Sequence, residues 1–251
     1  MEEKFLTDQG KIRTHNEDAG GVFYNGSGQL LAIVADGMGG HKAGDVASQM
    51  ATTIIQQKWQ DSPELTLPED TEAWLAESLQ EVNNAIFEKA DSKEECRGMG
   101  TTVVIAVCAK DFVTVTHIGD SRCYILNESG FKQITEDHSL VNELVRSGQI
   151  SRDDAEQHPR KNVLLKALGT EENVVADVQS IGWETGDRLL LCSDGLTNKV
   201  TDEELHNYVV AGTDAESTGK ELIYLANERG GEDNITLIII HHELPVKEGE
   251  S

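Results

Sequence analysis

The sequence predicts an α+β fold: a β-sandwich of two mainly antiparallel sheets flanked by helix pairs, in α-β-β-α layers. Three observations predict it. Short apolar runs separated by turn residues fill the middle of the chain, two amphipathic helical segments precede them, and two more follow. Strand runs segregated from helical pairs are typical of α+β folds, whereas parallel doubly wound sheets alternate strand and helix. In a chain of 251 residues, we expect one domain over residues 1–243 and a frayed polar tail over 244–251.

The N-terminal part of the chain predicts three strands and then two helices. The strands are expected around residues 5–7, 21–23 and 30–35, the last from the apolar run LLAIVA. A glycine-rich stretch leads into AGDVASQMATTIIQQKW, and TEAWLAESLQEVNNAIFEKA comes later. Both segments place apolar residues at every third or fourth position, which is the pattern of an amphipathic helix.

The middle of the chain predicts an antiparallel meander of four strands. Residues 101–134 contain four strand-like runs separated by the turn sequences AKD, GDS and NESG. A polar, helical stretch from 138 to 165 then interrupts the strand pattern. Beyond it we expect strands at 174–179, 188–192 and 235–241, and helices near 202–210 and 215–229.

Charge and cysteine usage limit the class of protein. The formal net charge of −24 argues against binding to nucleic acid or to an anionic membrane, because both need clustered basic residues. The longest apolar run, VVIAVCA, has seven residues and is too short to span a bilayer. The N-terminus lacks the pattern of a signal peptide. The widely spaced cysteines are expected to be free buried thiols in a reducing compartment, the cytoplasm: Cys96, Cys108, Cys123 and Cys192.

Aspartates stand at the ends of strand-like runs, beside glycine. Asp36 ends the run LLAIVA, Asp120 and Asp194 follow two later runs, and Asp233 comes just before the last one. One Asp-Gly alone predicts only a turn. Four such sites together suggest carboxylates that converge at one edge of a sheet structure. Clustered hard oxygen ligands suit Mg²⁺ or Mn²⁺.

The familiar motifs of other enzyme classes are missing from the sequence. Lys42 occupies the position at which a dinucleotide fingerprint starting at Gly37 needs glycine or alanine, and Asp45 replaces the lysine of a P-loop. Neither the nucleophile motif of serine hydrolases nor the zinc motif His-Glu-x-x-His is present. The glycines more plausibly allow close approach of a ligand or expose a carbonyl to a metal.

The segment KIRTHNED adds a basic residue and two more carboxylates. Arg13 is a candidate for bidentate phosphate binding, and Glu17 and Asp18 follow it closely. An arginine with acidic neighbours is more commonly a surface salt bridge. Both interpretations stay open from the residues alone.

Taken together, these motifs resemble the metal-dependent serine/threonine protein phosphatases of the type 2C (PPM) family, in their soluble bacterial form. The resemblance covers nearly the whole chain, through TDQGKIRTHNEDA, VADGMGGHKAGDVAS, GMGTT, HIGDSRCY, TEDHSLV, LLLCSDGLTN and GGEDNIT. These blocks in this order are far more specific than any one motif. The family implies a β-sandwich with helix pairs and a two-metal site at one end.

The resemblance also implies roles for the aspartates. Asp36 would bridge two Mn²⁺ or Mg²⁺ ions, and the carbonyl of Gly37 would bind one of them. Asp194 and Asp233 would complete the other position. Asp120, together with Asp194, resembles the third metal site of bacterial members.

Further residues receive supporting roles from the same resemblance. Glu17 would touch metal through water, Asp18 would support the metal ligands, and Arg13 would hold the substrate phosphate. The segment from 138 to 165, which we call the flap, corresponds to a variable element beside the active site of the family.

One position departs from the pattern of many eukaryotic members. They carry a histidine that is proposed to protonate the leaving alkoxide, whereas this chain has Met38, which cannot donate a proton. His41 is one substitute, and metal-bound or bulk water is the other.

The implied function is metal-dependent hydrolysis of phosphoserine and phosphothreonine in proteins, opposing a bacterial serine/threonine kinase, by a monomer. Two alternatives remain at this point. One is a metal-assisted hydrolase of small phosphoesters. The other is a non-catalytic member of the fold that only binds a phosphorylated partner, which the presence of Asp36, Asp194 and Asp233 disfavours.

Overall fold

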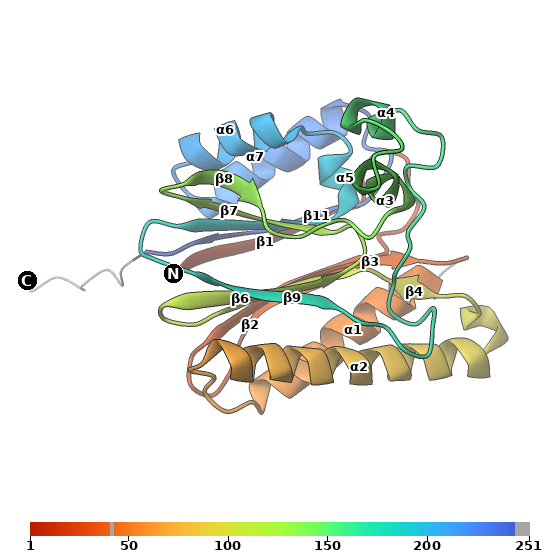
Figure 1. The fold of residues 1–251 in the computed structure, drawn as a ribbon, viewed down its shortest axis with the longest axis horizontal. Coiled ribbons are helices and arrows are strands. Elements are labelled where there is room, and N and C mark those ends of the chain that lie inside the picture. Colours follow the sequence, from red (N-terminus) through yellow and green to blue (C-terminus); the bar gives the residue numbers. More distant parts are fainter. Residues whose placement is uncertain (41–42, 244–251) are drawn as a thin grey trace, which may run out of the picture.

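Two antiparallel sheets lie face to face, with a pair of helices on each outer face (Figure 1). The computed structural model describes residues 1–40 and 43–243. The first sheet has the strand order β1-β11-β10-β7-β8, and the second has the order β2-β3-β5-β6-β9, with the short β4 beside β3. This arrangement confirms the predicted α+β sandwich.

The first sheet contains β1 (Glu2–Asp8), β7 (Arg122–Asn127), β8 (Gly130–Gln133), β10 (Arg188–Cys192) and β11 (Ile235–His241). The second contains β2 (Asp18–Tyr24), β3 (Leu30–Met38), β4 (Gly100–Thr101), β5 (Val103–Cys108), β6 (Phe112–Ile118) and β9 (Asp177–Gly182). The helices are α1 (Ala43–Gln60), α2 (Pro68–Ser92), α3 (Leu140–Arg146), α4 (Arg152–Glu156), α5 (Asp194–Thr197), α6 (Asp202–Ala211) and α7 (Ala215–Glu228), with a 3₁₀ turn at Glu94–Cys96.

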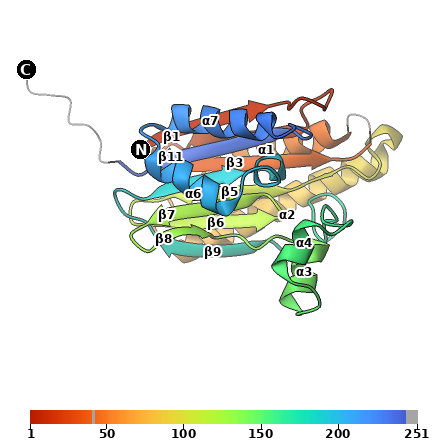
Figure 2. The same cartoon turned by 90° about the horizontal axis from the view of Figure 1, so that it is seen from above.

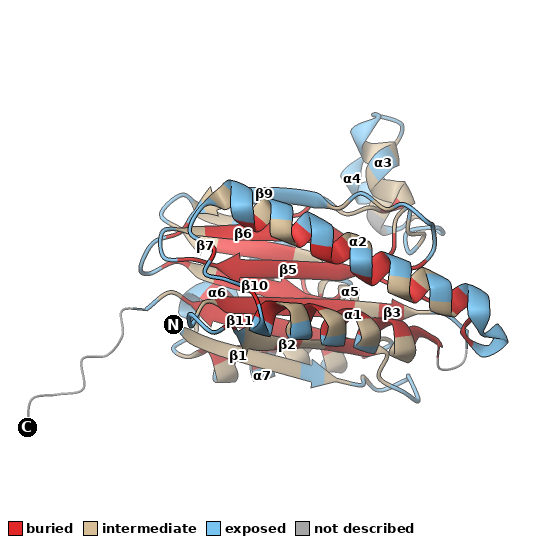
Figure 3. Cartoon of the chain, turned by 90° about the horizontal axis from the view of Figure 1, so that it is seen from below, coloured by how far each residue is buried: buried red, intermediate tan, exposed pale blue. Residues whose placement is uncertain are grey.

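Three apolar layers hold these elements together. The strand β3 shows why its sequence is a continuous apolar run: Leu31 and Ile33 face the layer under α1 and α2, while Leu30 and Val34 face the layer between the sheets. Successive side chains of a strand point to opposite faces, so a strand covered on both sides has no polar position. Figure 3 shows the buried residues concentrated in the central strands and on the inner sides of α1 and α2. A third layer joins the first sheet to α6 and α7.

The predicted four-strand meander is wrong at one connection. β5 pairs with β6 in the second sheet, and β7 pairs with β8 in the first, but β6 and β7 do not pair with each other. Residues 119–121 carry the chain from one sheet to the other. Gly119 adopts φ +104° there, a backbone conformation that favours glycine. Turn residues between two apolar runs cannot distinguish a hairpin from such a crossing.

Other boundaries moved by a few residues. β9 spans Asp177–Gly182, later than the predicted 174–179, and the short helix α5 was not predicted. The polar stretch 138–165 holds α3 and α4, and Figure 2 shows these helices set off to one side of the sheets. The four cysteines are buried and free, as predicted. None of the helices in the described ranges is long and apolar enough to cross a membrane, and the predicted tail 244–251 lies outside those ranges.

The layer between the sheets should dominate stability. Ile238 is 0% exposed in this layer, so Ile238→Ala should lower the free energy of unfolding by about 2–5 kcal/mol through lost burial and a residual cavity. Urea unfolding measures the loss. Val210, 50% exposed on α6, is the control: Val210→Ala should change it by less than about 0.5 kcal/mol. Equal effects of the two variants would contradict the layer assignment.

Candidate metal centre

Carboxylates from separate elements crowd together at one end of the sandwich. Asp18 and Asp36 are paired in register across β2 and β3, and Asp194 begins α5 directly after β10. The pKa of the Asp36 carboxyl is raised well above its ordinary value by burial and then by the charges of Asp18, Asp194, Asp120 and Asp233. The four aspartates at strand ends therefore lie in one region together with Asp18, within electrostatic reach of Asp36.

Gly37 is required by the close approach of three backbone segments. Its N–H donates to the carbonyl oxygen of Glu17 over 3.1 Å. A Cβ at this position would overlap the backbone oxygens of Glu17 and Gly44, the latter in the first turn of α1. The start of α1 thus lies directly on the end of β3, beside Asp36.

Two buried carboxylate oxygens at this centre lack a partner. Asp18 Oδ1 and Asp194 Oδ1 have no hydrogen bond within residues 1–40 and 43–243. Their second oxygens are held: Ser193 Oγ donates to Asp18 Oδ2 over 2.8 Å, and Asn198 Nδ2 donates to Asp194 Oδ2 over 2.9 Å. Buried polar atoms without partners are rare in proteins and call for an explanation, and a bound cation among clustered carboxylates is one that satisfies both oxygens.

The electrostatics of the cluster favour a bound cation. Burial, together with the charges of Asp194 and Asp233, raises the pKa of Asp18 to about 7, although the hydrogen bond from Ser193 opposes the rise. Burial and the charge of Asp194 raise the pKa of Asp120 to about 8. Ionised carboxylates this close repel one another in a medium of low dielectric constant. A divalent cation among hard oxygen donors removes this repulsion, so the residues present fit Mg²⁺ or Mn²⁺.

Arg13 and Glu17 lie at the rim of the carboxylate cluster. Arg13 Nη2 donates to Asp233 Oδ2 over 2.8 Å, and Arg13 Nη1 lies 3.9 Å from Glu17 Oε2. The salt bridge considered for Arg13 therefore exists, but it lies at this centre. The Arg13 side chain remains 46% exposed, so its guanidinium faces solvent as well as carboxylate. Burial, followed by the charge of Asp233, raises the pKa of Glu17.

The side chain at position 38 cannot donate a proton to a leaving group. Met38 pairs with Gly100 in the β3–β4 ladder and carries no ionisable group. His41, the suggested substitute, lies outside the described residues.

The sequence reasoning missed Asn234, which fixes the loop that carries Arg13 and Glu17. Asn234 Oδ1 accepts from the N–H of Glu17 over 2.8 Å, and Asn234 Nδ2 donates to the carbonyl oxygens of Gln9 and His15 over 2.9 Å each. Its side chain is buried, at 3% exposed. The signal available was a polar amide directly before the last apolar run, where an apolar residue would extend the strand.

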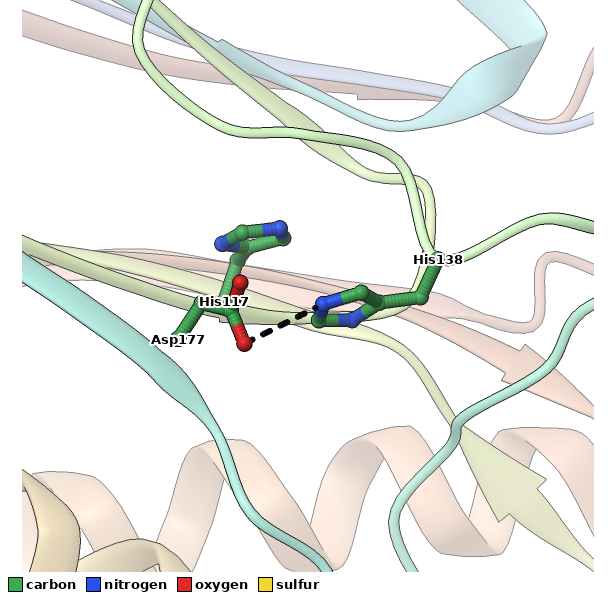
Figure 4. Close-up of side chains that lie close together, drawn as sticks. All are labelled: His117, His138 and Asp177. Atoms are coloured by element: carbon green, nitrogen blue, oxygen red, sulfur yellow. Dashed lines mark ion pairs between the residues drawn. The ribbon is translucent and has the colours of Figure 1, made fainter. Parts of the chain in front are cut away.

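A second group of titratable side chains lies where the flap begins (Figure 4). Its members are His117, His138 and Asp177. His138 Nδ1 accepts from the N–H of Gly119 over 3.2 Å, and His138 Nε2 lies 3.3 Å from Asp177 Oδ1. A neutral imidazole has one lone pair, which the N–H of Gly119 occupies, so Nε2 carries the proton and donates to Asp177. Lys166 lies 3.3 Å from the same carboxylate oxygen. This arrangement is a hydrogen-bonded clamp, because no nitrogen lone pair of His138 is left for a metal.

Comparison with known proteins identifies relatives over nearly the full length. A model of the family described as protein phosphatase 2C matches residues 11–228. The chain is 48% identical over 247 residues to a serine/threonine phosphatase, stp, of Listeria welshimeri, covering 98% of each sequence.

Solved structures agree with the sequence relatives. The serine/threonine phosphatase Stp1 from Staphylococcus aureus superposes with a TM-score of 0.92 at 40% identity, covering 97% of this chain and 95% of that one. The catalytic domain of the phosphatase PstP, solved in complex with two manganese ions, superposes with a TM-score of 0.82 at 34% identity, covering 94% of this chain and 96% of that one.

Asn234 should control the order of the loop over residues 9–17. Asn234→Ala removes three hydrogen bonds and leaves the N–H of Glu17 without its partner, so we expect a loss of about 1–3 kcal/mol in unfolding free energy. Amide hydrogen exchange should accelerate in residues 9–17 while β5 stays protected. Asn127→Ala, which removes only one exposed turn hydrogen bond, is the matched control. Unchanged exchange in the 9–17 loop of Asn234→Ala would contradict this role.

Proposed function

The chain belongs to the protein phosphatase 2C family, and from that premise we propose that it hydrolyses phosphoserine and phosphothreonine in proteins with Mn²⁺ or Mg²⁺. The observation that carries this proposal is the convergence of five aspartates with two unpartnered buried oxygens beside an exposed guanidinium. Metal-dependent protein phosphatases need these three parts: hard oxygen ligands, unsatisfied coordinating atoms, and a phosphate-binding cation at the rim.

The aspartates take the roles of metal ligands in this proposal. Asp36 would hold both ions, the carbonyl of Gly37 would hold one of them, and Asp194 and Asp233 would hold the other. Asp120 with Asp194 would hold a third ion. Two observations support these roles. Each of these carboxylates acts electrostatically on another. Gly37 follows Asp36 directly and has no side chain that would obstruct its carbonyl group.

Residues at the rim bind and orient the phosphoryl group. Arg13 holds the substrate phosphate with the guanidinium N–H groups that face solvent, because a planar guanidinium matches phosphate oxygens in pairs. Asp233 fixes the direction of that side chain through the 2.8 Å hydrogen bond. Glu17 would interact with a bound metal ion through water. Asp18, held by Ser193, supports the ligands from behind.

The metal ions supply two chemical effects when bound: they lower the pKa of water to give a nucleophile at neutral pH, and they neutralise charge on the phosphoryl oxygens. The chain's own residues hold the substrate phosphate and the metal ligands in place. Arg13 stabilises the negative charge that develops on the transferred phosphoryl group. The strand ends at this edge of the sandwich hold the aspartates in place to bind the ions.

Cysteine-based phosphatase chemistry does not fit this chain. A nucleophilic cysteine needs a lowered pKa and access to substrate. Here burial raises the pKa of the Cys108 and Cys192 thiols to about 12, and all four cysteines are buried. Hydrolysis by water without a phosphoenzyme remains the consistent route. Proton delivery to the leaving group falls to water or to His41, since Met38 has no proton to give.

The biological setting follows from the same premise. We propose that residues 1–243 form one catalytic domain that acts as a monomer in the cytoplasm on phosphorylated proteins and opposes a cognate serine/threonine kinase. Free buried thiols are consistent with a reducing compartment.

A peptide assay tests the reaction directly. Phosphate release is measured from a phosphothreonine and a phosphotyrosine peptide, each with Mn²⁺ and with excess chelator. We expect Mn²⁺-dependent release that favours phosphothreonine. Release that persists in chelator would refute the metal mechanism, and no release under any metal would favour a protein that only binds phosphorylated partners.

Asp36→Asn should separate metal function from folding. Without a carboxylate to bridge the ions, turnover should fall by more than about a hundredfold, beyond the losses seen when only a supporting residue is changed. In excess chelator the variant should melt at a temperature at least as high as that of the wild type in the same chelator, because a neutral amide replaces a carboxyl group whose ionised form the cluster disfavours. Near-normal turnover of Asp36→Asn would contradict the assignment of two metal ions to this centre. Val210→Ala serves as a control for handling and assay.

A further inference from the structure

A pair of buried hydroxyl groups adjoins the main chain of two members of the carboxylate cluster, Asp36 and Asp120. Thr102 Oγ1 and Ser121 Oγ are 2.7 Å apart, and the residues are 2% and 1% exposed. Thr102 lies between β4 and β5, and Ser121 follows Asp120 in the crossing from β6 to β7. Neither residue belongs to the proposed metal ligands or to the phosphate-binding rim.

Thr102 forms two hydrogen bonds with the main chain of Asp36, one as acceptor and one as donor. The N–H of Asp36 donates to Thr102 Oγ1 over 3.1 Å, and the N–H of Thr102 donates to the carbonyl oxygen of Asp36 over 2.9 Å. Thr101 Oγ1 donates to the same carbonyl oxygen over 2.9 Å. The hydroxyl of Thr102 therefore connects the backbone of the proposed bridging ligand to the side chain of Ser121.

The turn that carries Asp120 also packs against Thr102. A Cβ on Gly119 would lie 2.6 Å from Thr102 Cβ, so only a glycine lets the backbone come this close. Gly119 and Ser121 flank Asp120 in the sequence. One contact and one hydrogen bond, on the two sides of Asp120, thus fasten its turn to a single threonine.

We propose that Thr102 and Ser121 are positioning residues of the metal centre, whose hydroxyl pair fixes the backbone of Asp36 relative to the turn of Asp120. This inference rests on the proposed function. Like charges on the two aspartates push them apart when no cation lies between them. The buried hydrogen bonds of Thr102 to Asp36 and to Ser121 oppose that movement. They keep the ligand oxygens close to the geometry that a metal ion requires.

Thr102→Val tests this connection, because valine keeps the shape of threonine but replaces the hydroxyl, which accepts from the N–H of Asp36, with a methyl group. Titration calorimetry of the full chain with MnCl₂ should give an affinity about 10- to 100-fold weaker than that of the wild type, the range found for residues that orient metal ligands. Thr102→Ser restores the hydroxyl and should recover most of the affinity. Ser121→Ala should weaken binding too, and its effect should not add to that of Thr102→Val.

The chain offers a matched control in Thr114. Its hydroxyl lies 2.8 Å from Ser180 Oγ, forming a second hydroxyl pair, between β6 and β9, and Thr114 is 0% exposed. Neither partner contacts the carboxylate cluster through a hydrogen bond. Thr114→Val should therefore lower thermal stability while Mn²⁺ affinity stays at the wild-type value.

The outcomes separate this inference from the function beneath it. A folded Thr102→Val protein that binds Mn²⁺ as tightly as the wild type would overturn the positioning role. Equal weakening by Thr114→Val would also overturn it, because the effect would then follow general stability. If Thr102→Val does not fold, Ser121→Ala decides, since it leaves the N–H of Asp36 paired with Thr102. A wild-type chain that binds no Mn²⁺ refutes the proposed function, and this inference with it.

Discussion

Mutual repulsion of buried carboxylates is the constraint on which the rest of this structure depends. Asp18, Asp36, Asp120 and Asp194 all have raised pKa values, with burial as the first cause and neighbouring aspartates among the others. A protein selected only for stability would not gather such groups at one edge. The sandwich must be rigid enough there to hold them together, and its central strands, apolar on both faces, provide that rigidity.

Neutral hydrogen-bonding groups hold the charged ones in place. Ser193 binds Asp18, Asn198 binds Asp194, and Asn234 fixes the loop before Asp18. None of these groups adds a charge to the cluster. Neutral donors orient carboxylates while leaving oxygen lone pairs free, whereas a buried lysine or arginine would compete with a metal ion for the same atoms. Arg13 is an exception at the rim, where it donates to Asp233 Oδ2 while its side chain remains partly exposed to solvent.

The sequence predicted the layers and the convergence well because both depend on local patterns. A continuous apolar run marks β3, helical periodicity marks α1 and α2, and an aspartate beside glycine marks each strand end. The meander and the role of Asn234 depend instead on which segments meet across the fold. β6 and β7 look like neighbours in a hairpin, and nothing within residues 112–127 reveals that they belong to different sheets. Asn234 reads as a polar residue before a strand until its partners in the 9–17 loop are known.

The one topological error and the chemistry have a common cause. Because the chain crosses between sheets at residues 119–121, Asp120 lies within electrostatic reach of Asp194, at the start of α5 after the first sheet's β10, and of Asp36, on β3 of the second sheet. A hairpin would have kept Asp120 on one sheet. The left-handed Gly119, its contact with Thr102 and the hydroxyl of Ser121 are thus needed both to make the crossing and to aim the carboxylate. In this fold the connection between the sheets is itself part of the metal centre.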